Sequence, residues 1–417
     1  MCPSTPAAVQ PPWLSIVGIG AGGWDQLSPE AQEVVTSAPW VIGGARHLEM
    51  LPAVVNQTCQ VWPSPLSKGV EQIMARRGTS VCVLASGDPF WFGVGATLAR
   101  HVDAAEMRVW PQPSAMSLAA SRMGWALQHV ACVSVHGRAL DRVAAHVTHG
   151  NRLFVLSWDG TTPAALAHLL VERGFGASQI TVLAELGGVD EKRISARAKA
   201  WSQPETAALN IVAVECVAKP NATPIARSAG RPDALFDNDG QLTKREVRAV
   251  VMALLAPGSA ERLWDIGAGS GAIGIEWMLA DARSRAIAVE ADPARAGRVR
   301  ANAHQCGVPA LECIEGRAPD ALAGLPAPDA IFIGGGLTTP GLVESCRAAL
   351  ASPRGRIVAS SVTVEGDAVL ADAHATHGGT LRRIGVERVE PLGRFRGWQP
   401  QRSVTLWCSI QEFGGSS

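Results

Sequence analysis

Residues 243–377 alternate short apolar runs with helical patterns, and this alternation limits the possible folds more than any other feature of the chain. Each apolar run precedes a helical stretch, and the runs are RLWDIG, RAIAVE, LECIEG, DAIFIG and GRIVASS. Strict alternation predicts parallel strands in one sheet with helices on both faces. Two further runs, LRRIGVERVEPL and QRSVTLWCSI, are separated only by GRFRGWQP. They predict an antiparallel hairpin at the sheet edge.

The residues before position 219 carry a second α/β pattern. Its strand candidates are LSIVGIG, WVIGG, SVCVLASGDP, MRVWP, ACVSVHG, RLFVLSWDG, ITVLAEL and ALNIVAVEC. Two small α/β lobes with a cleft between them would fit this order. Residues 219–240 lack periodicity and are rich in Pro, Gly, Asn and Asp, which is typical of a linker. We therefore expect domains at residues 12–218 and 241–413, joined by a linker at 219–240.

Charge and cysteine content narrow the classes of function. The 37 basic and 37 acidic residues balance, so no overall field attracts nucleic acid or an anionic membrane. The nine cysteines form no CxxC pair, as is typical of reduced thiols in a cytoplasmic protein. The sequence shows neither a secretory leader pattern nor a run of 18 apolar residues. We expect a cytoplasmic enzyme with no membrane or nucleic-acid partner and no metal.

The stretch DIGAGSGAIG is the strongest local motif. Gly267, Gly269 and Gly271 follow a strand and open a helix, so backbone N–H groups can face a ligand. NAD and S-adenosylmethionine both fit such a loop, and Glu290 could accept ribose hydroxyls in either case. NAD is disfavoured, because no sequence remains after the hairpin for the second half of a dehydrogenase. A tight turn without a ligand is the other alternative.

The form GxGxG after Asp265 resembles the class I methyltransferases, and the resemblance implies S-adenosylmethionine. In DAIFIGGGL, residues Gly334, Gly335 and Gly336 stand where amino-group methyltransferases of this fold often carry an (N/D)PP(Y/F) loop. Three glycines leave room for a bulky methyl acceptor. A flexible loop with no role in recognition is the alternative.

The stretch GIGAGG satisfies GxGxxG at Gly18, Gly20 and Gly23, but no acidic residue ends the following strand. Four later stretches, ASGDPFWFGVG, PQPSAMSLAASRMGW, LSWDG and AELGGVDE, complete a set that resembles the tetrapyrrole methylase family, a class III methyltransferase fold. The resemblance implies a cleft for S-adenosylmethionine between two lobes, lined by Gly87, Asp88, Pro89, Ser114 and Ala115. It implies that the first loop, with Gly18, Gly20 and Gly22, faces the substrate. Without the companion motifs, Gly-Asp-Pro is only a tight turn.

Together the two halves resemble the fused precorrin methyltransferases of aerobic cobalamin biosynthesis, over nearly the whole chain. The resemblance implies methylation at C5 by the first domain, and methylation at C15 with loss of the ring C acetate carboxyl by the second. It implies two S-adenosylmethionine sites per chain and a homo-oligomer. The cofactor contacts that it implies in the second domain are Thr243, Gly267, Ala268, Gly269, Ser270, Gly271, Glu290 and Ala318. Glu290 is a departure, because family members often carry Asp there.

A precorrin carries many carboxylates, for which isolated Arg and His residues are natural partners. The candidates are Arg46, His47, His136, Arg138, Arg394 and Arg396. Ordinary surface or ion-pair positions are the alternative for each. No catalytic side chain is assigned, because an enamine-like carbon needs placement more than a strong base. Decarboxylation can use the macrocycle as electron sink, so the protein has to orient and desolvate the acetate.

Four other functions stay open. The second domain could methylate RNA or a small molecule, although no basic stripe supports RNA. The fusion could act on a different tetrapyrrole. The chain could be a sensor that binds S-adenosylmethionine or a tetrapyrrole without turnover. A dehydrogenase that uses either glycine loop is disfavoured.

Overall fold

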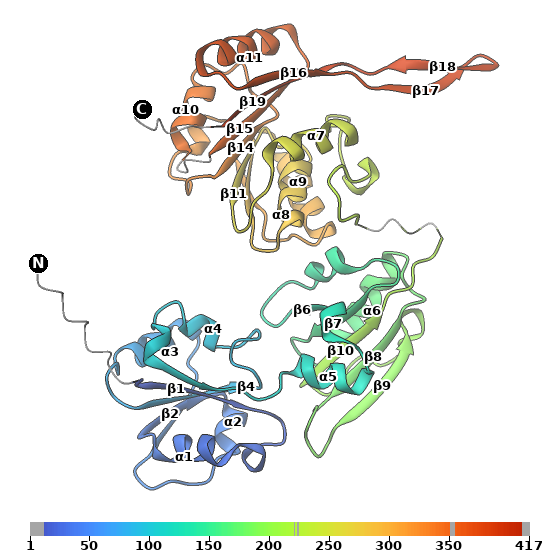
Figure 1. Cartoon of the computed structure of the whole chain (residues 1–417). Helices are drawn as coiled ribbons and strands as arrows, with labels where there is room; N and C mark the ends of the chain where they lie inside the picture. Colours follow the sequence, from blue (N-terminus) through green and yellow to red (C-terminus); the bar gives the residue numbers. More distant parts are fainter. Residues whose placement is uncertain (1–11, 221, 223–224, 351–354, 411–417) are drawn as a thin grey trace, which may run out of the picture. The chain divides into compact units, whose positions relative to one another are not determined.

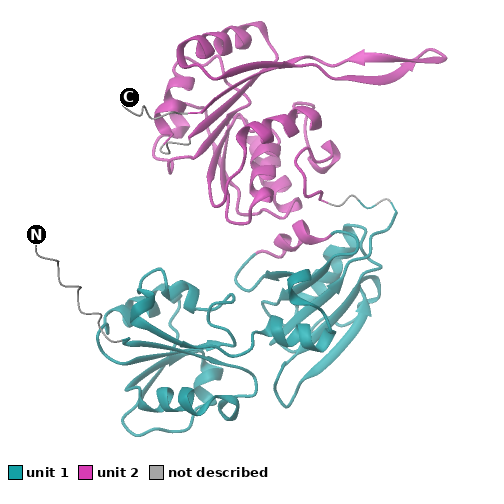
Figure 2. Ribbon diagram, viewed as in Figure 1, with its two compact units in different colours: residues 1–138, 148–222 teal, residues 139–147, 223–417 magenta. Residues whose placement is uncertain are grey.

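The computed structural model describes residues 12–220, 222, 225–350 and 355–410 of the chain (Figure 1). These residues form two compact units, coloured separately in Figure 2. Unit 1 comprises residues up to 138 together with 148–222, and unit 2 comprises 139–147 together with the residues from 223 onward. Both units combine helices with sheets, which confirms the predicted α/β class.

The first lobe of unit 1 is a five-stranded parallel sheet in the order β3-β2-β4-β1-β5. Its strands are β1 (Leu14–Ile19), β2 (Trp40–Gly43), β3 (Thr58–Val61), β4 (Val81–Ser86) and β5 (Met107–Trp110). Its helices are α1 (Pro29–Ser37), α2 (Ala45–Glu49), α3 (Leu66–Met74) and α4 (Gly95–Leu98). Because successive strand side chains point to opposite faces, Leu14 and Ile16 enter one core and Val17 enters the other.

The second lobe of unit 1 is a mixed sheet in the order β6-β7-β10-β8-β9. Its strands are β6 (Ala131–Ser134), β7 (Arg152–Leu156), β8 (Gln179–Ala184), β9 (Lys192–Arg197) and β10 (Asn210–Glu215). Its helices are α5 (Ala115–Met123) and α6 (Thr162–Glu172). Only β6 and β7 pair in parallel, and the other pairs are antiparallel.

Unit 2 is built on a seven-stranded sheet in the order β13-β12-β11-β14-β15-β19-β16. Its strands are β11 (Arg262–Ile266), β12 (Arg285–Glu290), β13 (Glu312–Glu315), β14 (Ala330–Ile333), β15 (Arg356–Ser361), β16 (Thr380–Ile384) and β19 (Val404–Ile410). Its helices are α7 (Arg245–Leu255), α8 (Ala272–Ala280), α9 (Pro293–Gln305), α10 (Leu342–Ala349) and α11 (Val364–His377). The strands from β11 to β15 are parallel, as predicted. Leu263 and Trp264 of β11 enter different cores, so both faces are covered.

The antiparallel edge predicted for this sheet is confirmed, because β19 runs antiparallel to both β15 and β16. Two details of the prediction were wrong. The first run divides into β16 and β17 (Glu387–Leu392), and the stretch expected as a loop contains β18 (Phe395–Pro400). A turn at Gly393, with φ +58°, lets β17 and β18 pair as a separate hairpin, which projects from the sheet in Figure 1.

Residues 225–236 lie in the segment for which the sequence predicts a linker. Ile225, Leu235 and Phe236 are buried in the same core as α7 and α8. Short 3-10 turns complete the two units: η1 (Trp24–Gln26), η2 (Ala104–Glu106), η3 (Leu127–His129), η4 (Leu140–His146), η5 (Ala198–Ala200), η6 (Asp233–Leu235) and η7 (Asp320–Leu322). Within the described residues, every helix is too short or too polar to span a membrane.

Candidate functional site

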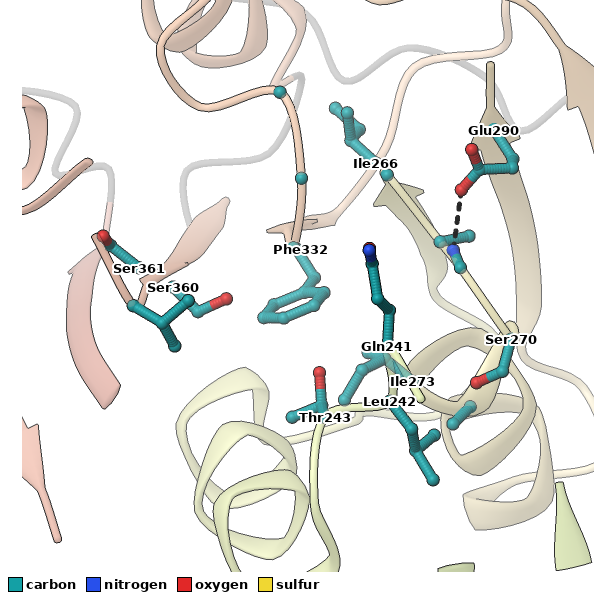
Figure 3. A pocket seen from close by; sticks show the side chains of 18 of the residues that line it. Gln241, Leu242, Thr243, Ile266, Ser270, Ile273, Glu290, Phe332, Ser360 and Ser361 are labelled. Carbon is teal, nitrogen blue, oxygen red and sulfur yellow. Dashed lines mark hydrogen bonds between the residues drawn. The ribbon is translucent and has the colours of Figure 1, made fainter. Parts of the chain in front are cut away.

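A cavity of about 940 Å³ opens at the carboxyl ends of the parallel strands of unit 2. Open α/β sheets commonly bind ligands at this edge. Figure 3 shows Glu290 on one side of the cavity and Ser360 and Ser361 on the other. The lining therefore runs from the loops after β11, β12 and β13 to those after β14 and β15.

The glycine loop after β11 forms the floor of the cavity. Gly267 has φ +66°, and a Cβ there would lie 2.5 Å from the Cα of Gly335 in the loop after β14. Only glycine fits such an approach. Gly271, with φ +75°, is the N-cap of α8 and packs against Val299, and it is not among the cavity-lining residues.

Glu290 ends β12 and is buried, with both carboxylate oxygens held by backbone N–H groups. Oε2 accepts from the N–H of Gly269 at 2.8 Å (Figure 3), and Oε1 accepts from that of Asp292 at 3.0 Å. A carboxylate oxygen has further acceptor capacity, so each oxygen can still receive a ligand hydroxyl. Backbone contacts thus fix this group at the wall of the cavity.

Asp265 is a second carboxyl behind the glycine loop, buried at 1% exposure. Oδ2 accepts from the N–H of Gly274 at 2.9 Å, whereas Oδ1 has no partner in the described part of the chain. Burial raises the pKa of Asp265 to about 7, and the charge of Glu290 acts in the same direction. The carboxyl is therefore partly protonated near neutral pH.

Residues 237–244 are here called the strap. Residues 240–244 of this segment line one side of the cavity. The side chain of Asn302 on α9 accepts from the N–H of Asp237 and donates to the C=O of Asp237 and of Ser270, each at 2.9 Å. One buried amide thus joins the strap to the glycine loop. Arg295 and Arg298, on the same face of α9, bind the carboxylate of Asp239 at 2.8 and 3.1 Å.

A buried ion pair fixes the other end of the strap. Arg248 and Glu276 are fully buried, and Nε donates to Oε1 at 2.8 Å. The same guanidinium donates to the C=O of Thr243 at 2.5 Å. Glu276 also accepts from the N–H groups of Gly230 and Arg231. The position of Thr243 therefore depends on a network that the local sequence pattern does not reveal.

The structure brings most of the site residues predicted for the second domain to this one cavity. They are Thr243, Gly267, Ala268, Gly269, Ser270, Glu290, Ala318, Gly334, Gly335 and Gly336. Arg394 and Arg396 are not in its lining, because both belong to the hairpin end at the β17–β18 turn. The lining contains four cations that sequence reasoning missed: Lys244, Arg295, Arg317 and Arg402. Only Arg317 carries a signal, because it follows a strand of the parallel sheet by two residues.

In unit 1 the loops predicted to form the first site converge. A Cβ on Gly18 would lie 1.9 Å from the carbonyl oxygen of Gly87, which accepts from the N–H of Gln112 at 3.1 Å. Gly87 has φ +56° and approaches the C=O of Pro113. Ser114 caps α5 by accepting from the N–H of Ser117, immediately before Ala115.

The other predicted positions of this loop set differ in their surroundings. Asp88 accepts from the N–H of Phe90 at 2.8 Å and closes the turn around Pro89. Gly20 has open space at its Cβ position, whereas a Cβ on Gly22 would meet the side chain of Gln26.

His47 lies beside these loops at 8% exposure. Nε2 is 3.1 Å from the hydroxyl of Ser86 and 3.2 Å from the guanidinium of Arg46. Because Arg46 can only donate, Nε2 acts as acceptor there and the proton lies on Nδ1, which has no partner among the described residues. Burial, followed by the charge of Arg46, lowers the pKa of His47 to about 4. The ring is therefore neutral at pH 7.

His136 and Arg138, the remaining candidates for carboxylate binding, are exposed just after β6. The guanidinium of Arg138 lies 5.8 Å from the centre of the Phe92 ring, in the loop after Gly87. Phe92 has φ +58°, an uncommon value for an aromatic residue. The structure thus places Arg138 beside the Gly-Asp-Pro loop.

Comparison with known proteins supports both units. The family "Tetrapyrrole (Corrin/Porphyrin) Methylases" matches residues 14–200, and the family "Precorrin methyltransferase domain" matches residues 234–411. These matches confirm the two predicted methyltransferase domains.

Two shorter relatives each correspond to part of the chain. The "Cobalt-precorrin-7 C(5)-methyltransferase" of Salmonella typhimurium is 29% identical and aligns with 43% of this chain and 88% of its own. The "Cobalt-precorrin-6B C(15)-methyltransferase (decarboxylating)" of the same species is 29% identical and aligns with 41% of this chain and 90% of its own.

A longer relative covers both parts. The "Precorrin-6Y C(5,15)-methyltransferase [decarboxylating]" of a Sinorhizobium species is 51% identical over 404 residues, which are 97% of each chain. The chain therefore belongs to the precorrin-6Y C(5,15)-methyltransferase (decarboxylating) family.

Proposed function

We propose that this chain transfers methyl groups from S-adenosylmethionine to C5 and C15 of a precorrin and removes the carboxyl group of the ring C acetate. One observation carries the proposal. The cavity of unit 2 brings together a glycine loop, a fixed carboxylate and three consecutive glycines, so that part of its lining carries no side chains. Such a cavity suits a nucleoside beside a bulky acceptor.

The cofactor end fits S-adenosylmethionine in its chemistry. Glu290 would accept the ribose hydroxyls with the lone pairs that its two backbone contacts leave free. Gly267 and Gly269 would let the backbone approach the ligand, and Ala318 would border the adenine. S-adenosylmethionine supplies an electrophilic methyl group on sulfur. These residues would orient the cofactor toward the acceptor carbon, and placement of the reacting groups is the main requirement for transfer.

The acceptor end has to place a macrocycle carbon opposite that methyl group. Gly334, Gly335 and Gly336 leave space for its rings, and Phe332 offers an apolar contact. The acceptor carbon uses a π electron pair to form the new carbon–carbon bond, and the electron pair of the broken bond stays on sulfur. The meso carbon then loses its proton to solvent.

The first domain would methylate C5 in the same way at a second site. Gly87, Asp88, Pro89, Ser114 and Ala115 would line the cofactor, and Gly18, Gly20 and Gly22 would face the macrocycle with Arg46 and His47. The close packing of Gly18 on Gly87 supports this assignment, because it joins the proposed substrate loop to the proposed cofactor loop. The existence of separate relatives named for C5 and C15 methylation supports a division between the domains.

Two measurements test the function. Titration of the full chain with S-adenosylhomocysteine should reveal two sites. Incubation with labelled S-adenosylmethionine and a precorrin should place two labels in the macrocycle, with release of one carbon dioxide. Binding without label would instead indicate a sensor.

We also propose that the chain self-associates through the β17–β18 hairpin. Val389, Leu392, Phe395 and Trp398 are 48–70% exposed on this hairpin, and β17 and β18 pair only with each other among the described strands. An isolated two-stranded hairpin is marginally stable in water, so a partner copy would stabilise it. Light scattering should show an oligomer that Trp398→Ser weakens, and a monomeric wild type would contradict the proposal. A cytoplasmic location stays a prediction.

A further inference from the structure

The acceptor end of the unit 2 cavity has charged and uncharged parts, and this division bears on which substrate carboxylate is lost. The sheet order separates the two ends of the cavity. Arg317 follows β13 and belongs to the nucleoside end, whereas Arg402 precedes β19 and belongs to the acceptor end. Lys244 stands at the start of α7, which contacts β14, β15 and β19.

A backbone hydrogen bond and an ion pair connect the segments that carry Arg402 and Lys244. Next to Arg402, the N–H of Gln401 donates to the C=O of Val386 at 2.8 Å and closes the base of the β17–β18 hairpin. An ion pair of 2.9 Å between Arg388 and Glu246 joins this hairpin to α7, two residues beyond Lys244. Both cations line the same cavity.

Neither Arg402 nor Lys244 forms an ion pair with any described residue, although both line the cavity. Arg295 differs, because Asp239 already neutralises its charge at 2.8 Å. Two cations without an ion-pair partner among the described residues suit an anionic ligand in this cavity.

Another part of the cavity lining, here called the neutral wall, carries no charged side chain. It comprises Gly334, Gly335, Gly336, Thr339, Ser360 and Ser361. The hydroxyl of Ser361 is already bonded to the N–H and C=O of Thr363, and that of Ser360 lies 3.4 Å from the C=O of Ile333. Arg402 is three residues before Thr405, the partner of Ser361 across the sheet, and lies just before β19 begins.

We propose that Arg402 and Lys244 bind carboxylates that the macrocycle keeps, and that the neutral wall receives the acetate that it loses. An ion pair stabilises a carboxylate and opposes loss of its charge as carbon dioxide. A carboxylate against the neutral wall loses hydration without gaining a cation, which favours decarboxylation. This inference rests on the proposed function of unit 2.

The electrons and atoms of the step balance without a further reactant. The bond between the acetate methylene and the carboxyl carbon breaks, and carbon dioxide leaves. The bonding electron pair passes into the conjugated macrocycle, and a proton from solvent completes the new methyl group. Arg402 and Lys244 orient the macrocycle during this step and are positioning residues.

The test measures KM for the precorrin, affinity for S-adenosylhomocysteine, and the fraction of C15-methylated product that keeps its acetate carboxyl. R402Q and the double variant R402Q/K244Q should raise KM, by roughly tenfold for the first, because each loses a charge-assisted contact. They should also increase the undecarboxylated fraction, with unchanged affinity for S-adenosylhomocysteine. R382Q, at an exposed position of β16 outside the cavity lining, is the matched control and should behave like the wild type.

A second variant places charge on the neutral wall. Thr339→Lys should slow carbon dioxide release more than methylation, because the new ammonium group stabilises the acetate. Equal behaviour of R402Q/K244Q and R382Q, or a wild-type product ratio for T339K, would overturn the inference. A wild-type chain that neither methylates C15 nor releases carbon dioxide would instead overturn the proposed function.

Discussion

The two glycine loops of this chain share a backbone arrangement but differ in their polar neighbours. Each lies at the carboxyl end of an inner strand, β1 or β11, whose neighbours are parallel to it, and each packs a glycine against a second loop: Gly18 against Gly87 and Gly267 against Gly335. A buried neutral imidazole, His47, lies near the first pair, whereas Glu290 and Asp265 stand beside the second. The comparison shows that a glycine motif specifies a close backbone approach, while residues outside the motif set the electrostatics of each site.

The largest effect is expected when a methyl group is added to either glycine that packs against a second loop, Gly267 or Gly18. Gly267→Ala should reduce C15 methylation at least roughly a hundredfold, because its Cβ would meet Gly335 and its φ is positive. Gly18→Ala should do the same to C5 methylation. Mass spectrometry of the product would separate the two losses.

Gly297→Ala is the control for both variants, because a Cβ there has open space on α9. It should leave both methylations intact. Loss of both activities in either loop variant would mean that the domains do not act separately.

The carboxyl of Asp265 should make unit 2 less stable as pH rises. Its pKa is about 7 in the folded chain against an ordinary 3.8, so the folded state binds the proton more tightly. The resulting stabilisation is complete below about pH 4 and is lost as pH rises to about 7, and it amounts to about 4 kcal/mol at most. Hydrogen exchange of β11 should show Asp265→Asn gaining stability relative to wild type over this range. A difference that is independent of pH would contradict the assignment.

His47 should make unit 1 less stable as pH falls, which is the opposite of the effect of Asp265 on unit 2. Its pKa is about 4 in the folded chain against an ordinary 6.5, so the unfolded state binds the proton more tightly. Stability is complete above about pH 6.5 and falls as pH decreases to about 4, by about 3 kcal/mol at most. In His47→Gln, exchange of β2 and β4 should lose this acid sensitivity. Retention of the full sensitivity would assign it to another group.

Asn302 has no counterpart in the glycine motif, yet its amide joins the strap to the loop. Asn302→Ala would leave the C=O of Ser270 and both backbone groups of Asp237 without these partners. We expect a loss of roughly 2 kcal/mol in the stability of unit 2 and a higher KM for S-adenosylmethionine in C15 methylation. The C5 methylation of the same chain is the internal control, and an equal change in both would contradict a local role.

The sequence predicted the parallel sheet of unit 2, its antiparallel edge and the end of the cavity near Glu290. These features follow from the spacing of apolar residues and from which residues come directly after a strand, and both can be read from a short stretch of sequence. It did not predict β18, since the stretch from Phe395 to Pro400 has no strict apolar alternation and forms a strand only through pairing with β17. It also missed Arg402 and Asn302. The amide of Asn302 joins elements that are distant in sequence, and Arg402 reaches the cavity because β19 pairs with β15, so no spacing rule reveals either residue.

The smallest effect is expected from Glu290→Gln. This variant tests most directly whether the two glycine loops bind the cofactor independently. The amide offers one acceptor oxygen instead of two, and its NH2 group would face a backbone N–H of Gly269 or Asp292. We expect roughly tenfold weaker binding of S-adenosylhomocysteine at one site, because one charge-assisted contact is lost. The other site should be unchanged, since no acid ends the corresponding strand of unit 1 at Gly43. Glu312→Gln, exposed at the start of β13, is the control. Calorimetric titration of the full chain would then resolve one strong and one weakened site, whereas two equally weakened sites would show that unit 1 depends on Glu290 and that the two glycine loops are not independent.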